Sequence, residues 1–272
     1  MEKYAVIVAG GSGKRMGSAT PKQFININGK PVIFYSIKAF YDQDPDTRVI
    51  VVLPPTEITE WSLKISNLFP EKKLVYASGG SERFLSVYNG LREVCDDGLV
   101  AIHDAARPLV SSLLISRLFS EAALHFCAIP AINPPETVRL KTVIGNSLLG
   151  HNQQILSQKS EASETTPLDE LSTIYPRDKV FLIQTPQVFK AALLKKAYRH
   201  LMDELLNLNK ADSLEESVDT AKTIASRFTD DAAIWEYAGN QVHLVMGEPT
   251  NVKITLPHDL LFASYMLNRQ PL

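Results

Sequence analysis

Several features that would place this chain in a broad class are missing from its 272 residues. No apolar run reaches the roughly 18 residues that a membrane-spanning helix needs. Positive charge is not in excess either, because the formal net charge is −2. A protein that binds nucleic acid without sequence preference needs a general basic surface, which this charge balance excludes. We therefore expect no nucleic-acid partner and no membrane partner.

Cysteine is also scarce, with Cys95 and Cys127 as the two examples. Both fall in apolar segments without the spacing of a metal site, so we expect buried thiols in a reducing compartment. The first residues have the pattern of a strand rather than of a secretory leader. These features predict a cytoplasmic protein. Its hydrophobic content of 45% is enough to build a full core.

The most informative segment that is present is a strand-like run followed by a glycine-rich loop. Tyr4–Ala9 is apolar and has the length of a buried strand. The loop after it holds glycines and cations close together: Gly10, Gly11, Gly13, Lys14, Arg15, Gly17 and Lys22. Glycines let backbone N–H groups approach a ligand, and cations beside them favour negative charge. The segment therefore predicts a polyphosphate-binding loop.

Spacing excludes two common phosphate-binding loops. The loop of nucleoside triphosphatases needs glycine where Val8 stands and serine or threonine where Arg15 stands. The dinucleotide-binding loop of NAD-dependent oxidoreductases needs a third glycine where Met16 stands. What remains is a glycine-rich turn with Arg15, followed by Lys22 seven residues after that arginine.

Strand-like and helix-like segments alternate through the first half of the chain. We expect strands at Tyr4–Ala9, Val49–Leu53, Leu74–Tyr76, Leu99–His103 and Cys127–Ile132. We expect helices at Val32–Tyr41, Glu57–Leu68, Arg83–Val94 and Leu113–His125. Such alternation is typical of an α/β fold with a mainly parallel sheet flanked by helices. Ligands of such sheets bind beyond the carboxyl ends of the strands, so Gly10–Arg15 and His103–Arg107 are expected to converge there.

The alternation is interrupted between residues 133 and 178. Gln153–Glu170 is polar and hard to bury, which is typical of a mobile surface insertion. Beyond it we expect further elements, in order: strand Val180–Ile183, helices Phe189–Asn207, Leu214–Ser226 and Ala232–Tyr237, strand Val242–Met246 and a closing helix from Pro257. Residues 1–272 thus form a single predicted domain that carries 133–178 as an insertion.

Five motifs along the chain resemble those of one enzyme family. They are the opening loop with Pro21-Lys22-Gln23-Phe24, His103-Asp104-Ala105-Ala106-Arg107-Pro108, Gln184-Thr185-Pro186-Gln187-Val188-Phe189, Thr229-Asp230-Asp231-Ala232 and Asn251-Val252-Lys253-Ile254-Thr255. Their order and spacing are similar to those of the 2-C-methyl-D-erythritol 4-phosphate cytidylyltransferases of the non-mevalonate isoprenoid pathway. The resemblance implies a Rossmann-like nucleotidyltransferase fold in which 133–178 is an arm that pairs with the second subunit of a homodimer.

The resemblance also implies a reaction and its catalytic residues. The phosphate of an acceptor would attack the α-phosphorus of CTP, and pyrophosphate would leave. Arg15 and Lys22 match the family's pair that stabilises the five-coordinate α-phosphate. Asp104 would bind Mg²⁺ or another divalent cation together with the CTP phosphates, because hard cations prefer carboxylate oxygen. A lysine directed inward is costly unless it meets an anion, so Lys253 is expected to meet a phosphate and to take part in catalysis.

The remaining expected contacts divide between the two substrates. By resemblance, the residues for CTP are Ala9, Gly10, Gly11, Gly13, Gly80, Ser86, Asp104 and Ala105. Those for the acceptor phosphate are Arg107, Thr137, Arg177, Thr185 and Lys253. Simpler interpretations exist for some of them: Asp104 as a helix cap or a partner of Arg107, and the two threonines as strand or turn residues. His103 lacks a second metal ligand at a suitable spacing, so we interpret it as structural.

Two other functions remain open from the sequence. A ribitol-5-phosphate cytidylyltransferase would share the fold and most motifs, and Ala9-Gly10-Gly11 is closer to those enzymes. Ala106 and the segment Thr229–Ala232 favour the isoprenoid enzyme instead. A non-catalytic nucleotide-binding protein on the same fold would be expected to lack Arg15, Lys22 or Asp104, and all three are present.

Overall fold

The computed structural model describes residues 1–10, 20–141, 172–208 and 228–269. These residues form two compact units. The first unit comprises Met1–Ile132 and Ile183–Leu272, and the second comprises Asn133–Leu182. The predicted helix Leu214–Ser226 and the polar segment Gln153–Glu170 lie outside the described residues.

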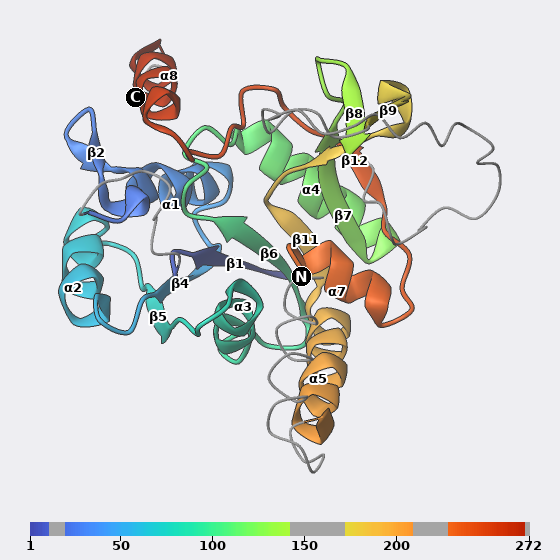
Figure 1. The fold of residues 1–272 in the computed structure, drawn as a ribbon. Coiled ribbons are helices and arrows are strands. Elements are labelled where there is room, and N and C mark those ends of the chain that lie inside the picture. The colour runs from blue at the N-terminus through green and yellow to red at the C-terminus, as the bar shows by residue number, and fades with distance from the viewer. Residues whose placement is uncertain (11–19, 142–171, 209–227, 270–272) are drawn as a thin grey trace, which may run out of the picture. The chain divides into compact units, whose positions relative to one another are not determined.

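A mainly parallel sheet forms the centre of the first unit (Figure 1). Its strand order is β10-β7-β11-β6-β1-β4-β5, and β12 pairs with β7. The five strands predicted in the first half of the chain correspond to β1 (Glu2–Val8), β4 (Arg48–Leu53), β5 (Val75–Ser78), β6 (Gly98–Asp104) and β7 (Cys127–Ile132). The strands β4-β1-β6 and the pair β4-β5 run parallel, as the βαβ pattern predicted. The prediction of an α/β fold is confirmed.

Alternation along each strand directs side chains to two separate cores, because successive residues of a strand face opposite sides of the sheet. Ala5 and Ile7 of β1 face one core, and Tyr4 and Val6 face the other. The first core is covered by α1 (Val32–Gln43), α2 (Ile58–Leu68) and α4 (Ser112–His125). The second is covered by α3 (Arg83–Leu91), α5 (Ala191–Leu208) and α7 (Asp231–Tyr237). The sheet is therefore buried on both faces, which explains why its strands are almost continuously apolar.

The second half of the sheet differs from the prediction at one strand. Residues Gln187–Lys190 form β11, which lies between β6 and β7 and runs antiparallel to both. The prediction that a helix begins at Phe189 is wrong, because α5 begins only at Ala191. Phe189 is fully buried among neighbouring strands, and this tertiary contact decides its conformation. The remaining strands are short: β10 (Leu182–Ile183) and β12 (Leu244–Met246).

A small third core packs beside the sheet and supports the loop that follows β6. It joins Ala106 and Leu109 to Ile254 and to Ala263 of α8 (Pro257–Arg269). The hairpin of β2 (Asn26–Ile27) and β3 (Lys30–Pro31) follows the short helix η2 (Lys22–Phe24). The run of residues around Lys253 has the composition of a strand, but Asn251–Thr255 does not form one.

The second unit contains an antiparallel hairpin of β8 (Val138–Lys141) and β9 (Ser172–Tyr175), followed by the short helix η3 (Arg177–Lys179). In the register of the hairpin, Val138 pairs with Tyr175 and Arg139 with Ile174. The side chain of Ile174 is exposed on this unit. The role of this unit as the arm of a dimer stays a prediction.

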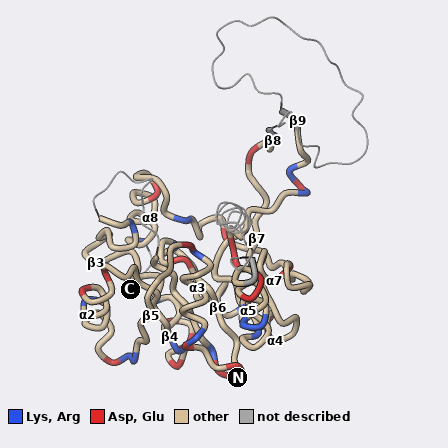
Figure 2. Tube along the Cα trace, turned by 60° about the horizontal axis from the view of Figure 1, so that its bottom comes forward, with Lys and Arg blue, Asp and Glu red and all other residues tan. Residues whose placement is uncertain are grey.

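Surface properties agree with the composition in most respects. Lys and Arg residues are interspersed with Asp and Glu residues over the trace of the first unit (Figure 2). Among the described residues, no helix is long and apolar enough to cross a membrane. Cys127 is buried as predicted, but Cys95 is exposed just beyond α3. The expectation of two buried thiols is therefore wrong for Cys95, whose neighbours Asp96 and Asp97 keep that turn at the surface.

Candidate active site

The ends of β1 and β6 lie side by side and define the edge at which the site is built. Val8 is the parallel partner of Asp104, and the Ala105 N–H donates to the Val8 carbonyl at 3.0 Å. On the other side of β1, the Ala9 N–H donates to the Val52 carbonyl at 2.9 Å. Backbone pairing thus continues past the ends of the strands and fixes Ala9, Gly10 and Ala105 at this edge. Gly11, Gly13 and Arg15 of the loop lie outside the described residues.

Glycines beside this edge allow two segments to approach each other closely. A Cβ atom on Gly10 would lie 2.9 Å from the Ser86 Oγ, and one on Gly79 would lie 3.6 Å from the Gly10 Cα. A Cβ on Gly80 would lie 2.5 Å from the Leu85 Cβ. The Ser86 hydroxyl accepts the Gly80 N–H at 3.0 Å. The start of α3 is therefore held against the end of β1.

Asp104 is the centre of a cluster of cations. Lys253 Nζ lies 2.7 Å from its Oδ2, Arg83 Nε lies 3.3 Å from its Oδ1, and Arg107 Nε lies 3.8 Å from its Oδ2. Burial by itself raises the pKa of the Asp104 carboxyl, but the three cations outweigh burial and hold the pKa well below its usual value. Asp104 is thus ionised throughout the physiological pH range.

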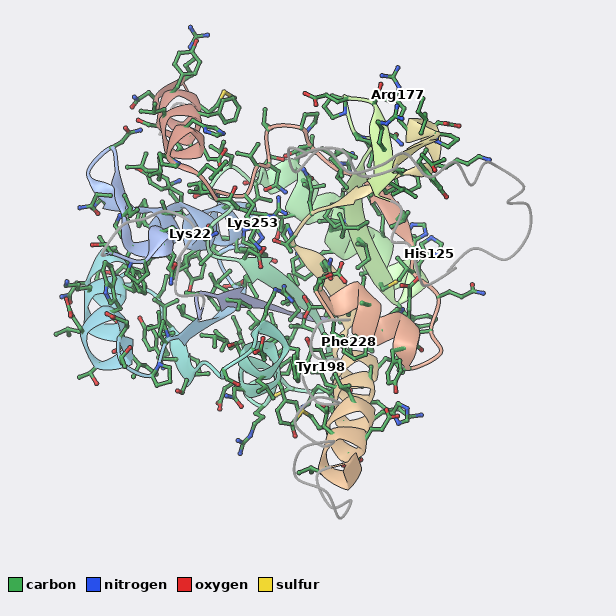
Figure 3. All side chains as sticks on the ribbon, in the orientation of Figure 1. Lys22, His125, Arg177, Tyr198, Phe228 and Lys253 are labelled. Carbon is green, nitrogen blue, oxygen red and sulfur yellow. The ribbon has the colours of Figure 1, made fainter. Side chains whose placement is uncertain are left out.

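Arg83 is held at its other end by a second buried aspartate. Its Nη2 donates to Asp231 Oδ2 at 2.8 Å, and Tyr198 donates its hydroxyl to Asp231 Oδ1 at 2.6 Å. Burial lowers the pKa of Arg83, but Asp231 and Asp104 reverse that effect and raise it. Burial and the neighbouring Asp231 raise the pKa of Tyr198 well above its usual value. Tyr198, labelled in Figure 3, therefore acts as a hydrogen-bond donor to Asp231.

The start of α7 fixes Asp231 through its backbone. Asp230 caps the helix by accepting the Ala233 N–H at 3.0 Å. The Gln187 side chain accepts the N–H groups of Asp231 and Ala232 and donates to Asp230 Oδ2 at 2.9 Å. These bonds satisfy the first N–H groups of the helix, which have no partner within it. The segment Thr229–Ala232 thus sets the position of Arg83.

Lys22 and Lys253 approach the cluster from segments far apart in the sequence (Figure 3). Lys22 Nζ donates to the carbonyl of Ile254 at 2.7 Å, directly beside Lys253. The Ile254 N–H donates in turn to the Ala106 carbonyl at 2.8 Å. Arg107 Nη1 donates to the Asn251 carbonyl at 2.8 Å. The loop of residues 251–254 is therefore fastened to both η2 and the end of β6.

The described part of this cluster has more positive than negative charge. Arg83, Arg107 and Lys253 face two carboxylates, those of Asp104 and Asp231, and Lys22 lies beside them at the Ile254 carbonyl. Burial lowers the pKa of Arg107, although Asp104 partly offsets this effect. Its Nε is buried and makes no hydrogen bond within the described structure. An additional anion would satisfy this guanidinium and balance the charge.

The Thr185 hydroxyl is used inside the protein. It accepts the Asp104 N–H at 3.0 Å and lies 3.1 Å from His103 Nδ1. The other ring nitrogen of His103 lies 3.2 Å from the Arg107 carbonyl, which can only accept, so Nε2 carries the hydrogen. Burial lowers the pKa of His103 to about 4, so its Nδ1 is an acceptor and the Thr185 O–H donates to it. The interpretation of His103 as structural agrees with this chain of hydrogen bonds.

Two of the residues expected at the acceptor phosphate belong to the second unit. Thr137 lies just before β8, and Arg177 begins η3 (labelled in Figure 3). Within their unit, Arg177 Nη1 donates to the Pro135 carbonyl at 3.3 Å, and both side chains are exposed. Arg107, Thr185 and Lys253 lie in the first unit, around Asp104. The assignment of all five residues to the acceptor stays a prediction.

Two residues of this site, Arg83 and Asp231, were not selected from the sequence as site residues. Arg83 follows Gly79-Gly80 at the start of a helix, where a cation near a glycine turn is a usable signal for an anion site. Asp231 stands in a motif of the family resemblance, but it meets Arg83 across 148 positions of sequence. Local patterns do not predict a pair that is so far apart.

Solved structures similar to this chain define the class of the fold. The structure from Thermus thermophilus has a TM-score of 0.64 at 25% identity and covers 98% of this chain and 100% of its own. The structure from Francisella tularensis has a TM-score of 0.66 at 25% identity, covering 97% and 99%. Both are described as 2-C-methyl-D-erythritol 4-phosphate cytidylyltransferases. The fold is thus the Rossmann-like fold of a nucleotidyltransferase.

Sequence comparison gives the family within that class. Residues 4–150 and 207–269 match the family model described as IspD, 2-C-methyl-D-erythritol 4-phosphate cytidylyltransferase. Relatives with that name from Bacteroides fragilis and Phocaeicola vulgatus are 38% and 36% identical, each over 98% of this chain and 100% of their own length. This chain belongs to the 2-C-methyl-D-erythritol 4-phosphate cytidylyltransferase family. The ribitol-5-phosphate alternative is not favoured by these comparisons.

Proposed function

We propose that the cationic site around Asp104 is where this nucleotidyltransferase passes a cytidylyl group from CTP to 2-C-methyl-D-erythritol 4-phosphate. The products are 4-diphosphocytidyl-2-C-methyl-D-erythritol and pyrophosphate. The observation that carries this location is the excess of positive charge among Lys22, Arg83, Arg107 and Lys253, next to the glycine-lined end of β1. Both substrates are anions, so fixed cations must first reduce their mutual repulsion.

The chemical step needs no covalent enzyme intermediate. An oxygen of the acceptor phosphate forms a bond to the α-phosphorus of CTP while the bond to the bridging oxygen of the β-phosphate breaks. That oxygen keeps the electron pair and departs with pyrophosphate. Lys22, which donates to the Ile254 carbonyl, is proposed to bind this phosphate, and Arg15 is its expected partner from the glycine-rich loop. Charge develops on the phosphate oxygens, so these cations stabilise the five-coordinate state more than the ground state.

The nucleoside is proposed to occupy the glycine-lined approach of α3 to β1. Gly10 and Gly80 both lie against Ser86, and Ala9 and Ala105 continue the ends of their strands. The lack of side chains at Gly10 and Gly80 allows the end of β1 and the start of α3 to pack this closely, because a Cβ at either position would meet its neighbours.

Arg107 and Lys253 are the residues proposed to bind the acceptor phosphate in the first unit. Arg107 has a buried Nε without a hydrogen bond in the described structure, and Lys253 is about one-third exposed beside Asp104. Thr137 and Arg177 are proposed to reach the acceptor from the arm of the second subunit of a homodimer. Thr185 is better suited to positioning, because its single O–H is donated to His103 and its oxygen accepts the Asp104 N–H.

Asp104 is the proposed protein ligand of Mg²⁺, or of another divalent cation bound with CTP. The donor set fits this ion, because Asp104 offers a permanently ionised carboxylate and magnesium takes its other ligands from phosphates and water. When bound, the ion would neutralise charge on the triphosphate. Lys253 would then release Asp104 Oδ2 and turn to a phosphate, which its partly exposed side chain allows. The enzyme is proposed to act in the cytoplasm.

A pyrophosphate-release assay with two acceptors tests this function. We expect turnover with CTP, Mg²⁺ and 2-C-methyl-D-erythritol 4-phosphate, and at least about 100-fold lower kcat/KM with ribitol 5-phosphate, since pocket contacts discriminate substrates at this level. Turnover with ribitol 5-phosphate alone would overturn the acceptor assignment. CTP binding without turnover on either acceptor would favour a non-catalytic nucleotide-binding protein.

Solution mass tests the proposed contribution of the second subunit. Light scattering of the untagged protein at several concentrations should give a mass of twice 30.2 kDa. An Arg177→Ala variant should raise the KM for the acceptor at least about tenfold with little change in the KM for CTP, because it removes a charged hydrogen bond to the phosphate. A strict monomer with full activity would remove Arg177 and Thr137 from the proposed site.

A further inference from the structure

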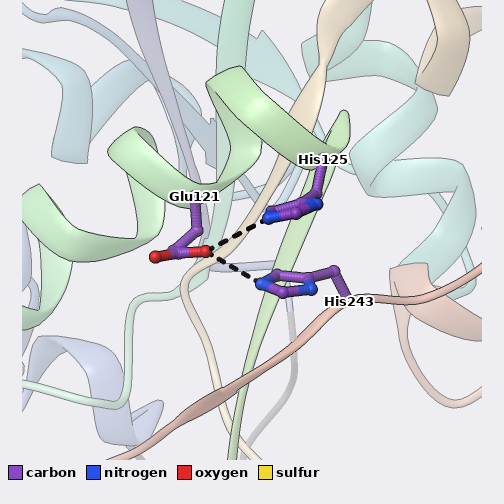
Figure 4. A group of neighbouring side chains, drawn as sticks. All are labelled: Glu121, His125 and His243. Carbon is purple, nitrogen blue, oxygen red and sulfur yellow. Dashed lines mark hydrogen bonds and ion pairs between the residues drawn. The ribbon is translucent and has the colours of Figure 1, made fainter.

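A second cluster of ligand-type side chains lies at the other edge of the same sheet. Glu121 and His125 stand one turn apart at the end of α4, and His243 comes from the segment that enters β12. Their side chains point toward one another (Figure 4). Glu121 Oε2 lies 2.9 Å from His243 Nε2 and 3.6 Å from His125 Nε2, and the ligand atoms of the three residues all lie within 4.8 Å of one another.

The spacing of these atoms suits one tetrahedral metal ion. Zinc binds imidazole nitrogen and carboxylate oxygen at about 2.0–2.2 Å, so two ligand atoms of a tetrahedral site stand about 3.3 Å apart. The two distances to Glu121 Oε2, 2.9 and 3.6 Å, lie on either side of this value. Two histidines and one glutamate are also a donor set that leaves a fourth position for water. Small movements of these side chains would therefore form the site.

Electrostatics at this place favour a cation. The last carbonyl groups of the 14-residue helix α4 direct partial negative charge toward its end, and Glu121 adds a full negative charge one turn before that end. The rings of His125 and His243 are stacked with centroids 3.9 Å apart and planes inclined by 20°. One divalent ion would satisfy a nitrogen of each ring and the shared carboxylate oxygen.

Hydrogen bonds of the backbone hold His243 beside β7. The Ile129 N–H donates to the His243 carbonyl at 2.9 Å, and the His243 N–H donates to Cys127 Sγ at 3.2 Å. Further along, Arg117 donates to the Met246 carbonyl, and Ser111 Oγ bonds Glu248 Oε1. The helix α4 is thus linked to residues 246–248 at two places. The three ligand-type residues lie further along, where α4 ends and the chain enters β12. A site held by such a scaffold loses little freedom when it binds an ion.

We propose that Glu121, His125 and His243 form a binding site for a divalent ion of the zinc class. The ion would fasten the end of α4 to the segment that enters β12. Because His243 pairs with the first residues of β7, which runs parallel to β6, the site lies at the amino ends of these strands. It is therefore at the edge opposite to Asp104, and its role would be structural rather than catalytic.

Zinc titration of the untagged full chain tests this proposal. A chromophoric chelator would compete for Zn²⁺ at about pH 7.5 without nucleotide, and millimolar Mg²⁺ would occupy oxygen sites such as Asp104 without competing for imidazole. We expect one equivalent of zinc to bind. The His243→Gln and His125→Gln variants should each lose at least about tenfold in affinity. Excess zinc should raise the Tm of the parent protein by roughly 5 °C or more.

The matched control is His258→Gln, which removes an exposed histidine that is adjacent to a single acid, Asp259. This variant should bind zinc as tightly as the parent protein. Co²⁺ gives a second readout, since tetrahedral coordination produces intense visible absorption bands that both cluster variants should lose. Absence of stoichiometric binding, or equal affinity in the parent and in the His125→Gln/His243→Gln double variant, would overturn the proposal.

Discussion

The two ends of Arg83 are built in different ways. At Asp231 the carboxylate is fully buried and its contacts are short: Arg83 at 2.8 Å, Tyr198 at 2.6 Å, and a backbone fixed by Gln187. At Asp104 the contacts are uneven: Lys253 lies at 2.7 Å but is about one-third exposed, and Arg83 and Arg107 lie at 3.3 and 3.8 Å. The Asp231 end is therefore suited to hold Arg83 in place, and the Asp104 end is suited to exchange partners when phosphates arrive.

This difference between the two ends of Arg83 should separate effects on stability from effects on activity. Removing one partner of a fully buried pair leaves an uncompensated charge and is strongly destabilising. Removing an exposed partner costs little stability, because water replaces it. Substitutions at the Asp104 end should thus reduce activity first, and substitutions at the Asp231 end should reduce stability first.

The largest effect is expected for Lys253→Ala. The variant removes a cation proposed to meet a phosphate, so kcat/KM should fall about 10²–10³-fold. The free energy of unfolding should change by less than about 1 kcal/mol, since Arg83 and Arg107 still face Asp104. Steady-state pyrophosphate release and urea unfolding measure the two quantities. The control is Lys195→Ala, which breaks a 2.6 Å ion pair between α5 and Asp96 and should leave kcat/KM unchanged.

The next largest effect is expected for Asp231→Asn, and here stability should change most. Arg83 loses its buried partner, so the free energy of unfolding should fall by about 3 kcal/mol and the Tm by roughly 6–12 °C. Calorimetry and urea unfolding give these values. Asp42→Asn is the control, because it breaks an exposed pair with Lys38 and should cost under about 0.5 kcal/mol. Equal stability of the Asp231→Asn and Asp42→Asn variants would contradict the anchoring role.

A smaller effect is expected at Thr185, which supports the Asp104 end through the backbone. Thr185→Val leaves the Asp104 N–H without its acceptor and should destabilise the protein by about 2 kcal/mol. Thr185→Ser keeps the hydroxyl and should recover most of that loss. If Thr185→Ser is stable but raises the KM for the acceptor as much as Thr185→Val does, then Thr185 contacts the substrate rather than positioning Asp104.

The smallest effect is expected for Tyr198→Phe at the Asp231 end. The change deletes the hydroxyl that donates to Asp231 Oδ1, while Arg83 keeps its ion pair. We expect a loss of about 1 kcal/mol in the free energy of unfolding and a kcat/KM within about threefold of the parent. Denaturant unfolding with parallel kinetics checks both values. A large loss of activity without a loss of stability would mean that this end also exchanges partners during turnover.

Much of the frame of this site follows from local sequence. The apolar run before Gly10 and the one before Asp104 predicted two parallel strands, and their neighbouring ends follow from sheet geometry. Short segments were less predictable: Gln187–Lys190 directly precedes a helix, and only its burial between β6 and β7 makes it a strand. The Arg83–Asp231 pair and the internal use of Thr185 depend on contacts across 148 and 81 positions, which no local pattern contains.

The loop of residues 251–254 has a consequence for the order in which activity can arise during synthesis. Its carbonyls receive Lys22 and Arg107, and it supplies Lys253 to Asp104. A nascent chain that has emerged only as far as β11 already holds the central strands and Arg83, but it lacks the segment that orients these cations. Such a chain also lacks α5 and α7, which cover one face of the sheet. Catalytic competence therefore waits until residues 251–254 have been synthesised.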